Sequence, residues 1–394
     1  MNSRIYLDYN ATTPLHPELV LAVTQAIAKF GNPSSVHWAG RESKKAISMA
    51  RENISKFLNI DPLEIVFTAG GSEANNLVLK GAIGILAETR REIISSTVEH
   101  PSVLKTMDYL KKKGFIIKWL KVSKDGSVDL TQLDTLLTPQ TGLVTIQLVN
   151  NETGNIFPLK EITSRAHSVG ALVHSDMVQA LGKIPIDLKD LGVDFASFAG
   201  HKFYSLKGSG FLYVKSGKRL ESLIHGGGQE RSRRAGTENT LAISSLGEAV
   251  KILGPRINET SERLKQFRDQ LEEKIKTNIS DCFITGDKSL RVANTINVTF
   301  SNTDGETLLI NLDTQGFAVS SGAACSSGSQ EPSPVLTAMG LTSEEASQSL
   351  RISLGWLTTQ EEVSSFYEAL IKAITKMREA NLQLVEREDK EMAW

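Results

Sequence analysis

Short apolar runs alternate with stretches of helical periodicity from about residue 64 onward. The short runs are apolar on both faces instead of alternating, which is typical of parallel strands covered by helices on both sides. The pattern therefore predicts an α/β fold with a mostly parallel central sheet. The expected strands are 64–68, 92–96, 115–120, 143–149, 171–176, 195–199 and 210–214.

The pattern changes after residue 240. Long helical stretches and separate strands at 293–300 and 349–355 predict a smaller α+β unit there. A chain of 394 residues is long enough for two domains with cores of their own. We expect a segment at 1–15 that packs with the small domain, a large α/β domain at 16–255 and a small α+β domain at 256–394.

Charge and cysteine content exclude several classes of protein. The 44 basic and 45 acidic residues leave a net charge of −1, so no overall attraction to nucleic acid or anionic lipid is expected. Two cysteines without paired spacing argue against a disulfide framework and against a zinc site. The start MNSRIYLDYN lacks the apolar core of a signal peptide, and no apolar run approaches membrane length. We expect a soluble cytoplasmic protein without a metal site.

The stretch TAGGSEAN at 68–75 joins a predicted strand to a predicted helix through two glycines. Backbone N–H groups at such a helix start, together with the helix dipole, form an anion site that commonly takes phosphate. Gly71 and Ser72 are the candidates. The alternative is that Ser72 only caps its helix.

Two further polar groups follow predicted strands. Asp176 ends the strand at 171–176, and Gln179 follows it closely. Lys202, in the sequence GHKF, comes after the strand at 195–199. Ligands bind beyond the carboxyl ends of parallel strands, so we expect these groups to meet. The alternative for Asp176 is a helix N-cap.

Taken together, these groups indicate one cofactor. A phosphate cradle, a carboxylate for a pyridinium nitrogen and an amine for an aldehyde are what pyridoxal phosphate needs. A lysine held near apolar walls has a lowered pKa and forms Schiff bases readily.

The two cysteines lie in different surroundings. Cys325 stands in VSSGAACSSGSQ, a segment of small residues that offers little to bury it, so a reactive thiol is one interpretation and a flexible linker the other. Cys282 lies among apolar neighbours and is expected to pack as a small hydrophobe.

The sequence resembles the cysteine desulfurases of the nitrogen-fixation and iron–sulfur-cluster-assembly type. These are pyridoxal-phosphate enzymes of the class-V aminotransferase family with the aspartate-aminotransferase fold. The resemblance covers nearly the whole chain, in order. It rests on YLDYNATTP (6–14), GNPSS (31–35), VEHPSV (98–103), VNNETG (149–154), GHK (200–202), HGGGQE (225–230), GTEN (236–239), SSGAACSSG (320–328) and LRISLG (350–355).

The resemblance implies a role for each residue around the cofactor ring. Lys202 would carry the cofactor as a Schiff base, and Asp176 would keep the ring nitrogen protonated. Gln179 would donate a hydrogen bond to the phenolate oxygen, with Asn151 near that oxygen and the substrate. His100 would stack on the ring and move protons.

At the phosphate, the resemblance implies contacts from Gly71, Ser72 and His201, and from the position of Ala199. The family commonly has serine at position 199, so one side-chain contact is expected to be missing here. Thr237 would reach the phosphate of the opposite subunit, which implies a homodimer.

The resemblance also implies the reaction. Arg351 would bind the substrate carboxylate with its planar fork, the alternative being an ordinary ion pair. Cys325 would take sulfur from L-cysteine as a persulfide and release L-alanine. The acceptor would be an iron–sulfur scaffold or a tRNA-thiolation enzyme, and a further alternative makes Cys325 a transient iron–sulfur ligand with a partner.

Other positions depart from the family pattern as well. Ser205-Leu206 replaces a usual Gly-Pro pair, and Met177 stands where a small residue is common. These departures leave two rivals open: a selenocysteine lyase, and a weakly catalytic subunit for sulfur relay or assembly.

Overall fold

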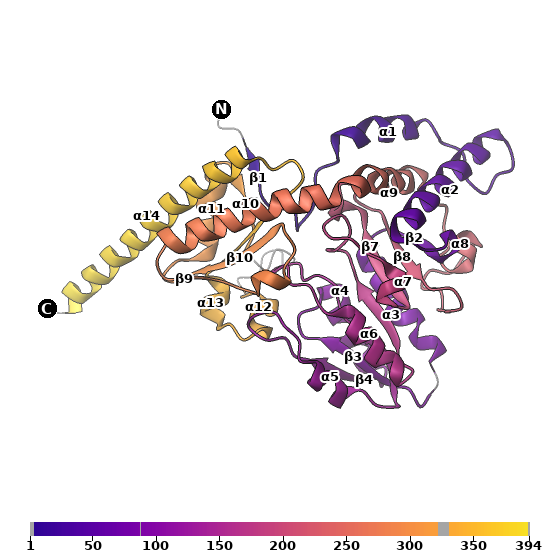
Figure 1. Cartoon of the computed structure of the whole chain (residues 1–394), viewed down its shortest axis with the longest axis horizontal. Helices are drawn as coiled ribbons and strands as arrows, with labels where there is room; N and C mark the ends of the chain where they lie inside the picture. The colour runs from indigo at the N-terminus through magenta and orange to yellow at the C-terminus, as the bar shows by residue number, and fades with distance from the viewer. Residues whose placement is uncertain (1–3, 87, 322–330, 393–394) are drawn as a thin grey trace.

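The computed structural model describes residues 4–86, 88–321 and 331–392, with side chains up to residue 381. Its largest element is a seven-stranded sheet at the centre of the larger half of the molecule (Figure 1). In spatial order its strands are β2 (Ile65–Thr68), β8 (Gly210–Val214), β7 (Phe195–Ala199), β6 (Leu172–Asp176), β5 (Thr141–Thr145), β3 (Glu92–Ser96) and β4 (Ile116–Leu120).

The sheet is mostly parallel, as the apolar pattern predicts. Strands β7, β6, β5, β3 and β4 pair in parallel, and β8 runs antiparallel to both of its neighbours. The carboxyl ends of β2, β3, β6 and β7 therefore meet at one edge. The loops that carry the predicted chemistry leave from this edge.

Helices cover both faces of this sheet, which explains why its strands are rich in apolar residues. On one face, α3 (Gly71–Gly81) and α4 (Pro101–Lys112) share a core with strand residues such as Val66 and Phe195. On the other face, α2 (Trp38–Leu58), α9 (Thr240–Leu253) and α6 (Leu159–Ser168) share a core with Phe67 and Phe198.

Helix α3 ends at Gly81, earlier than the end near residue 88 that its sequence pattern predicts. The backbone of Glu221 crosses there and donates from its N–H to the carbonyl of Gly81 at 2.9 Å. A Cβ atom at Gly81 would lie 2.3 Å from the Glu221 carbonyl oxygen, so only glycine fits this crossing.

A second, smaller unit contains an antiparallel sheet in the order β12 (Ser349–Ser353), β10 (Thr295–Phe300) and β9 (Cys282–Ile284). It packs with α10 (Ile257–Asn278), α11 (Gly305–Thr314) and α14 (Gln360–Met392) around its own core. Ile5 and Leu7 belong to this core, although they come from the start of the chain. The domain limits at residues 15 and 255 stay predictions.

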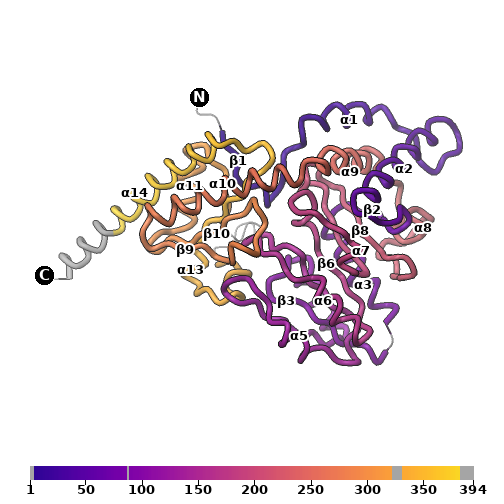
Figure 2. Tube along the Cα trace, in the orientation of Figure 1, coloured from indigo at the N-terminus to yellow at the C-terminus, as the bar shows by residue number. Residues whose placement is uncertain are grey.

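The long helix α14 runs beside α10 and α11 of the small unit (Figure 2). Among the described residues, no helix is both long enough and apolar enough to cross a membrane. The remaining elements are β1 (Ile5–Tyr6), which pairs in parallel with β11 (Phe317–Ala318), and α1 (Pro17–Ile27), α5 (Leu130–Leu136), α7 (Leu188–Leu191), α8 (Gln229–Ser232), α12 (Pro334–Ala338) and α13 (Ser343–Ser347). Single 3-10 turns occupy Pro62–Glu64, Ile83–Ile85, Gly200–Lys202, Gly254–Arg256 and Lys288–Leu290.

Candidate active site

A cavity of about 250 Å³ lies beyond the carboxyl edge of the large sheet. Of the predicted site residues that the structure describes, all but Thr237 come together around it. The predicted residues that line it are Gly71, Ser72, His100, Asn151, Asp176, Gln179, Ala199, His201, Lys202 and Arg351.

Lys202 enters the cavity from the 3-10 turn (Gly200–Lys202) that follows β7. Its Nζ donates hydrogen bonds to the carbonyl oxygens of Asn10 at 2.6 Å and Ala11 at 2.7 Å. Two main-chain acceptors therefore hold the amine at the cavity wall.

Asp176 ends β6 and is 6 % exposed. Its Oδ2 accepts from Asn75 Nδ2 at 2.7 Å, and its Oδ1 accepts from the N–H of Val178 at 3.0 Å. The residues after it form turns and not a helix, so the alternative of a helix N-cap is wrong. Each oxygen can accept more than one hydrogen bond, so the carboxylate remains able to bind a further donor.

His100 is the N-cap of α4, and its Nδ1 accepts from the N–H of Ser102 at 3.1 Å. Ser102 Oγ lies 2.7 Å from the same nitrogen and accepts from Asn75 Nδ2 at 2.9 Å. Burial lowers the pKa of His100, and the charge of Lys202 lowers it further against the opposing effect of Asp176. The ring is therefore neutral near pH 7, and because Nδ1 accepts a hydrogen bond, its proton lies on Nε2.

The sequence reasoning missed Asn75 and Ser102, which join His100 to Asp176. A signal was present for Asn75, which lies one helical turn after Ser72 and so shares its face. Ser102 stands in the VEHPSV motif but carried no role there.

The start of α3, where the sequence predicts an anion site, lies at the cavity. Gly70 is the N-cap and has no side chain, so Ser72 is not the cap and that alternative is wrong. A Cβ atom at Gly71 would lie 2.7 Å from Cγ2 of Val178, so glycine keeps the backbone N–H groups next to the cavity.

His201 and Ala199 line the same end of the cavity. Burial, with smaller effects from Lys202, Lys207 and His100, lowers the pKa of His201 to about 4, so the ring is neutral near pH 7. A neutral ring still donates one hydrogen bond to a phosphate. Ala199 is buried and offers only a methyl group, which agrees with the expected loss of one contact.

Arg351 and Asn151 form the opposite end. Arg351 is 2 % exposed on β12, where its Nη2 donates to Asp8 Oδ1 at 2.8 Å and its Nη1 to the Asn151 carbonyl at 3.1 Å. Neither Nε of Arg351 nor Oδ1 of Asn151 has a hydrogen-bond partner within the described part of the chain, although both atoms are buried. The ion-pair alternative for Arg351 therefore holds for Nη2, and Nε is left to bind another group.

Asn10 connects the parts of the site, and the sequence reasoning gave it no role. Its N–H donates to Ser353 Oγ at 2.9 Å, and its Nδ2 donates to Thr295 Oγ1 at 2.9 Å and to the Asn151 carbonyl at 3.1 Å. Its own carbonyl accepts from Lys202 and from Gln179 Nε2 at 2.9 Å. One asparagine thus joins the small sheet to the lysine.

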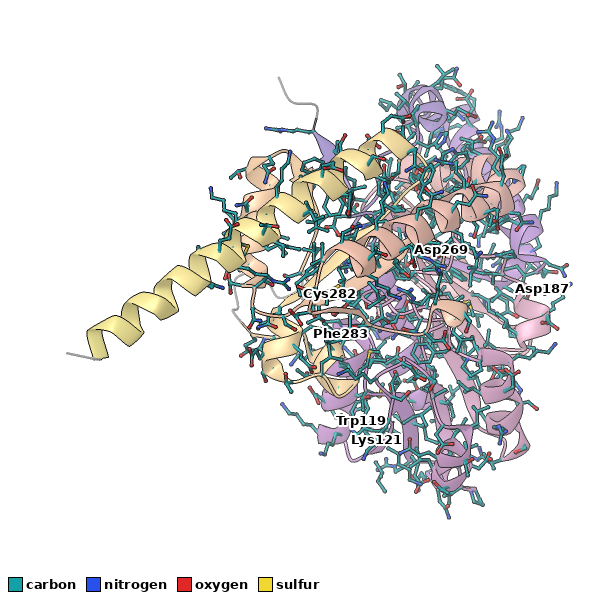
Figure 3. The ribbon with its side chains drawn as sticks, turned by 60° about the vertical axis from the view of Figure 1, so that its left-hand side comes forward. Trp119, Lys121, Asp187, Asp269, Cys282 and Phe283 are labelled. Carbon is teal, nitrogen blue, oxygen red and sulfur yellow. The ribbon has the colours of Figure 1, made fainter. Side chains whose placement is uncertain are left out.

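Thr237 is exposed before α9 and does not line the cavity of its own chain. Cys325 lies outside the described residues, and so do Gly322 and Gly328. The other cysteine, Cys282, lies on β9 beside Phe283 (Figure 3). Its Sγ contacts the Ile279 carbonyl at 3.2 Å, and burial raises the pKa of its thiol, as expected for a packed cysteine.

The donor groups fit pyridoxal phosphate. Gly71 and Ser72 at the start of α3, Asp176 and Lys202 all line this one cavity. Asn151 and Arg351 line the same cavity, and each has one buried polar atom without a hydrogen-bond partner among the described residues.

Known proteins are similar to this chain in both sequence and fold. The family model for aminotransferase class V matches residues 5–366. A protein named cysteine desulfurase IscS from Dictyoglomus turgidum is 42 % identical, with 96 % of each chain covered. A protein of the same name from Clostridium botulinum is 41 % identical, again with 96 % of each chain covered.

Two solved structures are similar as well. A NifS-like protein from Rickettsia africae has a TM-score of 0.85 and 36 % identity, covering 94 % of this chain and 99 % of its own. A protein described as SspA in complex with cysteine has a TM-score of 0.78 and 36 % identity, covering 89 % of this chain and 98 % of its own. The chain therefore belongs to the class-V aminotransferase family, among its cysteine desulfurase members.

Proposed function

We propose that this protein is a cysteine desulfurase that uses pyridoxal phosphate to remove sulfur from L-cysteine. L-Alanine is released, and the sulfur passes to Cys325 as a persulfide. The single observation that carries the proposal is the meeting of the Lys202 amine, the Asp176 carboxylate and the start of α3 at one cavity. The names of the similar proteins supply the substrate.

When bound, pyridoxal phosphate supplies an electron sink for bonds at the α-carbon of the substrate. Asp176 would hold the ring nitrogen in its protonated form, since a carboxylate fixed by Asn75 and by the N–H of Val178 cannot turn away. The backbone N–H groups at the start of α3, with Ser72 and His201, would hold the phosphate.

Residues at the other end of the cavity would orient the substrate. Arg351 and Asn151 both line the cavity, and Nη1 of Arg351 bonds to the Asn151 carbonyl; Nε of Arg351 and Oδ1 of Asn151 have no partner among the described residues. A guanidinium donor suits the substrate carboxylate, and an amide oxygen suits the substrate ammonium group. Asp8 holds the guanidinium from behind and so limits its rotation.

Two groups can move protons. The first is the Nζ of Lys202, which is held at the cavity by hydrogen bonds to the carbonyl oxygens of Asn10 and Ala11. His100 is neutral and is anchored through Nδ1 by Ser102, so that Nε2 is the atom left for proton exchange.

The sulfur transfer is balanced without an external oxidant. The bond between the β-carbon and the sulfur of the substrate breaks, the β-carbon gains a proton, and an S–S bond forms at Sγ of Cys325. A thiolate is the attacking form, so a thiol with the ordinary pKa of about 8.5 already supplies some nucleophile near neutral pH. The role of Cys325 rests on the SSGAACSSG motif.

We further propose a cytoplasmic homodimer in which Thr237 serves the site of the opposite subunit. Thr237 is exposed and is not among the residues that line its own cavity, which supports this assignment. The persulfide would pass to an acceptor such as an iron–sulfur scaffold or a tRNA-thiolation enzyme.

The Ser205-Leu206 departure does not favour the weakly catalytic alternative. The buried hydroxyl of Ser205 lies 2.7 Å from Ser245 Oγ, so the replacement leaves this polar group paired. Met177 is fully buried in the large core.

The test is turnover of L-cysteine by purified protein loaded with pyridoxal phosphate. Alanine and a persulfide on Cys325, found by mass spectrometry, are expected, and Lys202→Ala should form neither. Turnover of selenocysteine with no turnover of cysteine would replace the proposal with the lyase alternative. Loaded protein that turns over neither substrate would contradict catalysis altogether.

A further inference from the structure

A second lysine, Lys183, reaches the back of the cavity wall. It lies in the chain between the Asp176 turn and α7. Its Nζ donates to Asn10 Oδ1 at 2.7 Å and to Gln179 Oε1. Both acceptors belong to residues that line the cavity, whereas Lys183 lines a smaller hollow behind it.

The contact with Lys183 determines which way the Gln179 amide points. An amide has an oxygen that accepts and a nitrogen that donates, and the two ends have nearly the same shape. Because Oε1 accepts from Lys183, the donor Nε2 is on the other side and bonds to the Asn10 carbonyl at 2.9 Å. The second N–H of this nitrogen remains available to a group in the cavity.

Lys183 also supports Lys202, through its second hydrogen bond, to Asn10. Lys183 holds the side-chain oxygen of Asn10, which Asn294 Nδ2 also reaches at 3.1 Å. The main-chain oxygen of Asn10 in turn accepts from Lys202 Nζ. Loss of the Lys183 amine would therefore loosen the Gln179 amide, and also Asn10, which holds the Lys202 amine.

The charge state of Lys183 fits this arrangement. Burial lowers its pKa well below the ordinary value, and the charges of Lys202 and Arg351 lower it further. The Nζ of Lys183 carries at least two N–H groups in either protonation state, enough for both acceptors.

We propose that Lys183 is a positioning residue that turns the Gln179 amide so that its N–H group faces the bound cofactor. The inference rests on the proposed function, because that function assigns pyridoxal phosphate to this cavity. The competing interpretation is a buried lysine that only stabilises the fold.

The first experiment compares Lys183→Met with the wild type. Methionine is unbranched and of similar length, but it cannot donate. The matched control is Lys189→Met, which removes an exposed lysine six residues further along. We measure the dissociation constant of pyridoxal phosphate, the visible absorption band of the loaded protein and its pH titration, and the melting temperature of the cofactor-free protein.

In Lys183→Met, we expect the cofactor to bind about tenfold more weakly, the loss typical of one hydrogen bond of ordinary strength. The absorption band or its titration should shift, because the donor to the phenolate oxygen is no longer held. The control should match the wild type. A purely structural lysine would lower the melting temperature of the cofactor-free protein and leave the band of the loaded protein unchanged, and that result would overturn the proposal.

The second experiment is a double-mutant cycle with Gln179→Ala. If Lys183 acts through Gln179, its replacement should change cofactor affinity and the band much less once the amide is gone. Additive effects would contradict the proposal. Should Lys183→Met fail to fold, Lys183→Gln serves instead, since it keeps an uncharged donor and should fall between wild type and Gln179→Ala.

The outcomes separate this inference from the proposed function. Protein that binds pyridoxal phosphate but forms no alanine from cysteine would refute the desulfurase, while affinity and absorption would still decide the role of Lys183. An active desulfurase whose band does not respond to Lys183→Met would refute the inference alone. Wild-type protein that does not bind pyridoxal phosphate would refute both.

Discussion

The two ends of the cavity are built in different ways. The cofactor end comes from loops of one sheet, where Asp176 and Lys202 each follow a strand and Gly71 opens a helix directly after another. The substrate end joins distant segments, since Arg351 bonds to Asp8 across 343 positions of the chain and to Asn151 across 200. The cofactor end thus takes most of its residues from one sheet, with Asn10 and Ala11 holding the lysine, and the substrate end depends on how the small unit docks.

This difference suggests that changes at the cofactor end affect chemistry, whereas changes at the substrate end affect substrate affinity. The two ends meet at Asn10, which bonds to the small sheet and also to Lys202. Separate effects on kcat and KM can therefore test how independent the two ends are.

The largest effect is expected from Lys202→Ala, which removes the amine from the cofactor end. Activity should fall by about a thousandfold or more, as when one member of a catalytic unit is lost. In the wild type, borohydride followed by mass spectrometry should find the cofactor mass on Lys202. The control is Lys207→Ala, an exposed lysine nearby. Cofactor attached to another lysine would contradict the assignment.

Asp176→Asn should reduce kcat by about a hundredfold, because a neutral amide does not keep the ring nitrogen protonated. Its oxygen can still accept from Asn75, so the cofactor should remain bound and the melting temperature should change little. Steady-state kinetics and cofactor absorption check this. A rise in KM with an unchanged kcat would show that Asp176 affects substrate affinity and not the chemistry, which would contradict its assignment to the cofactor end.

Arg351→Lys should act at the substrate end. The planar fork is replaced by a point charge, so KM for cysteine should rise by roughly thirtyfold, while the affinity for pyridoxal phosphate stays the same. The matched change Arg268→Lys alters another buried arginine, which bonds to the Val292 carbonyl away from the cavity. Equal losses of cofactor affinity and cysteine affinity in Arg351→Lys would show that the two ends are not independent.

The smallest effect concerns stability. Glu152, next to Asn151, is buried and accepts from Ser333 Oγ at 2.5 Å. Burial raises the pKa of Glu152 to about 7, against the lowering effects of Ser333 and Arg351. Since the folded state binds this proton more tightly than the unfolded state, stability contributed by Glu152 is present below its ordinary pKa of 4.5 and declines until the pH passes about 7.

Glu152→Gln should therefore stabilise the protein by about 2 kcal/mol at pH 8 and change it little near pH 4.5. Urea unfolding at both pH values measures this. The exposed change Glu344→Gln serves as the control and should show no such pH dependence. Equal effects at both pH values would mean that Glu152 is not held in its protonated form.

Much of the cofactor end could be read from the chain. The strands at 92–96, 195–199 and 210–214 lie where the sequence pattern predicts them, because a strand covered on both faces is rich in apolar residues. Polar residues just after such strands, as at Asp176 and Lys202, must emerge at the ligand edge. The sequence by itself therefore determined the sheet and which residues line the cavity from it.

Only the tertiary structure decided what those residues contact. Ser102 and Lys183 carry no periodic signal, and the helical spacing of Asn75 from Ser72 names no partner; the roles of all three follow from hydrogen bonds that folding creates. The end of α3 at Gly81 and the pairing of Arg351 with Asp8 likewise depend on segments far apart in the chain. Local patterns record burial and turn chemistry, whereas the direction of a side-chain hydrogen bond depends on which distant partner packs beside it.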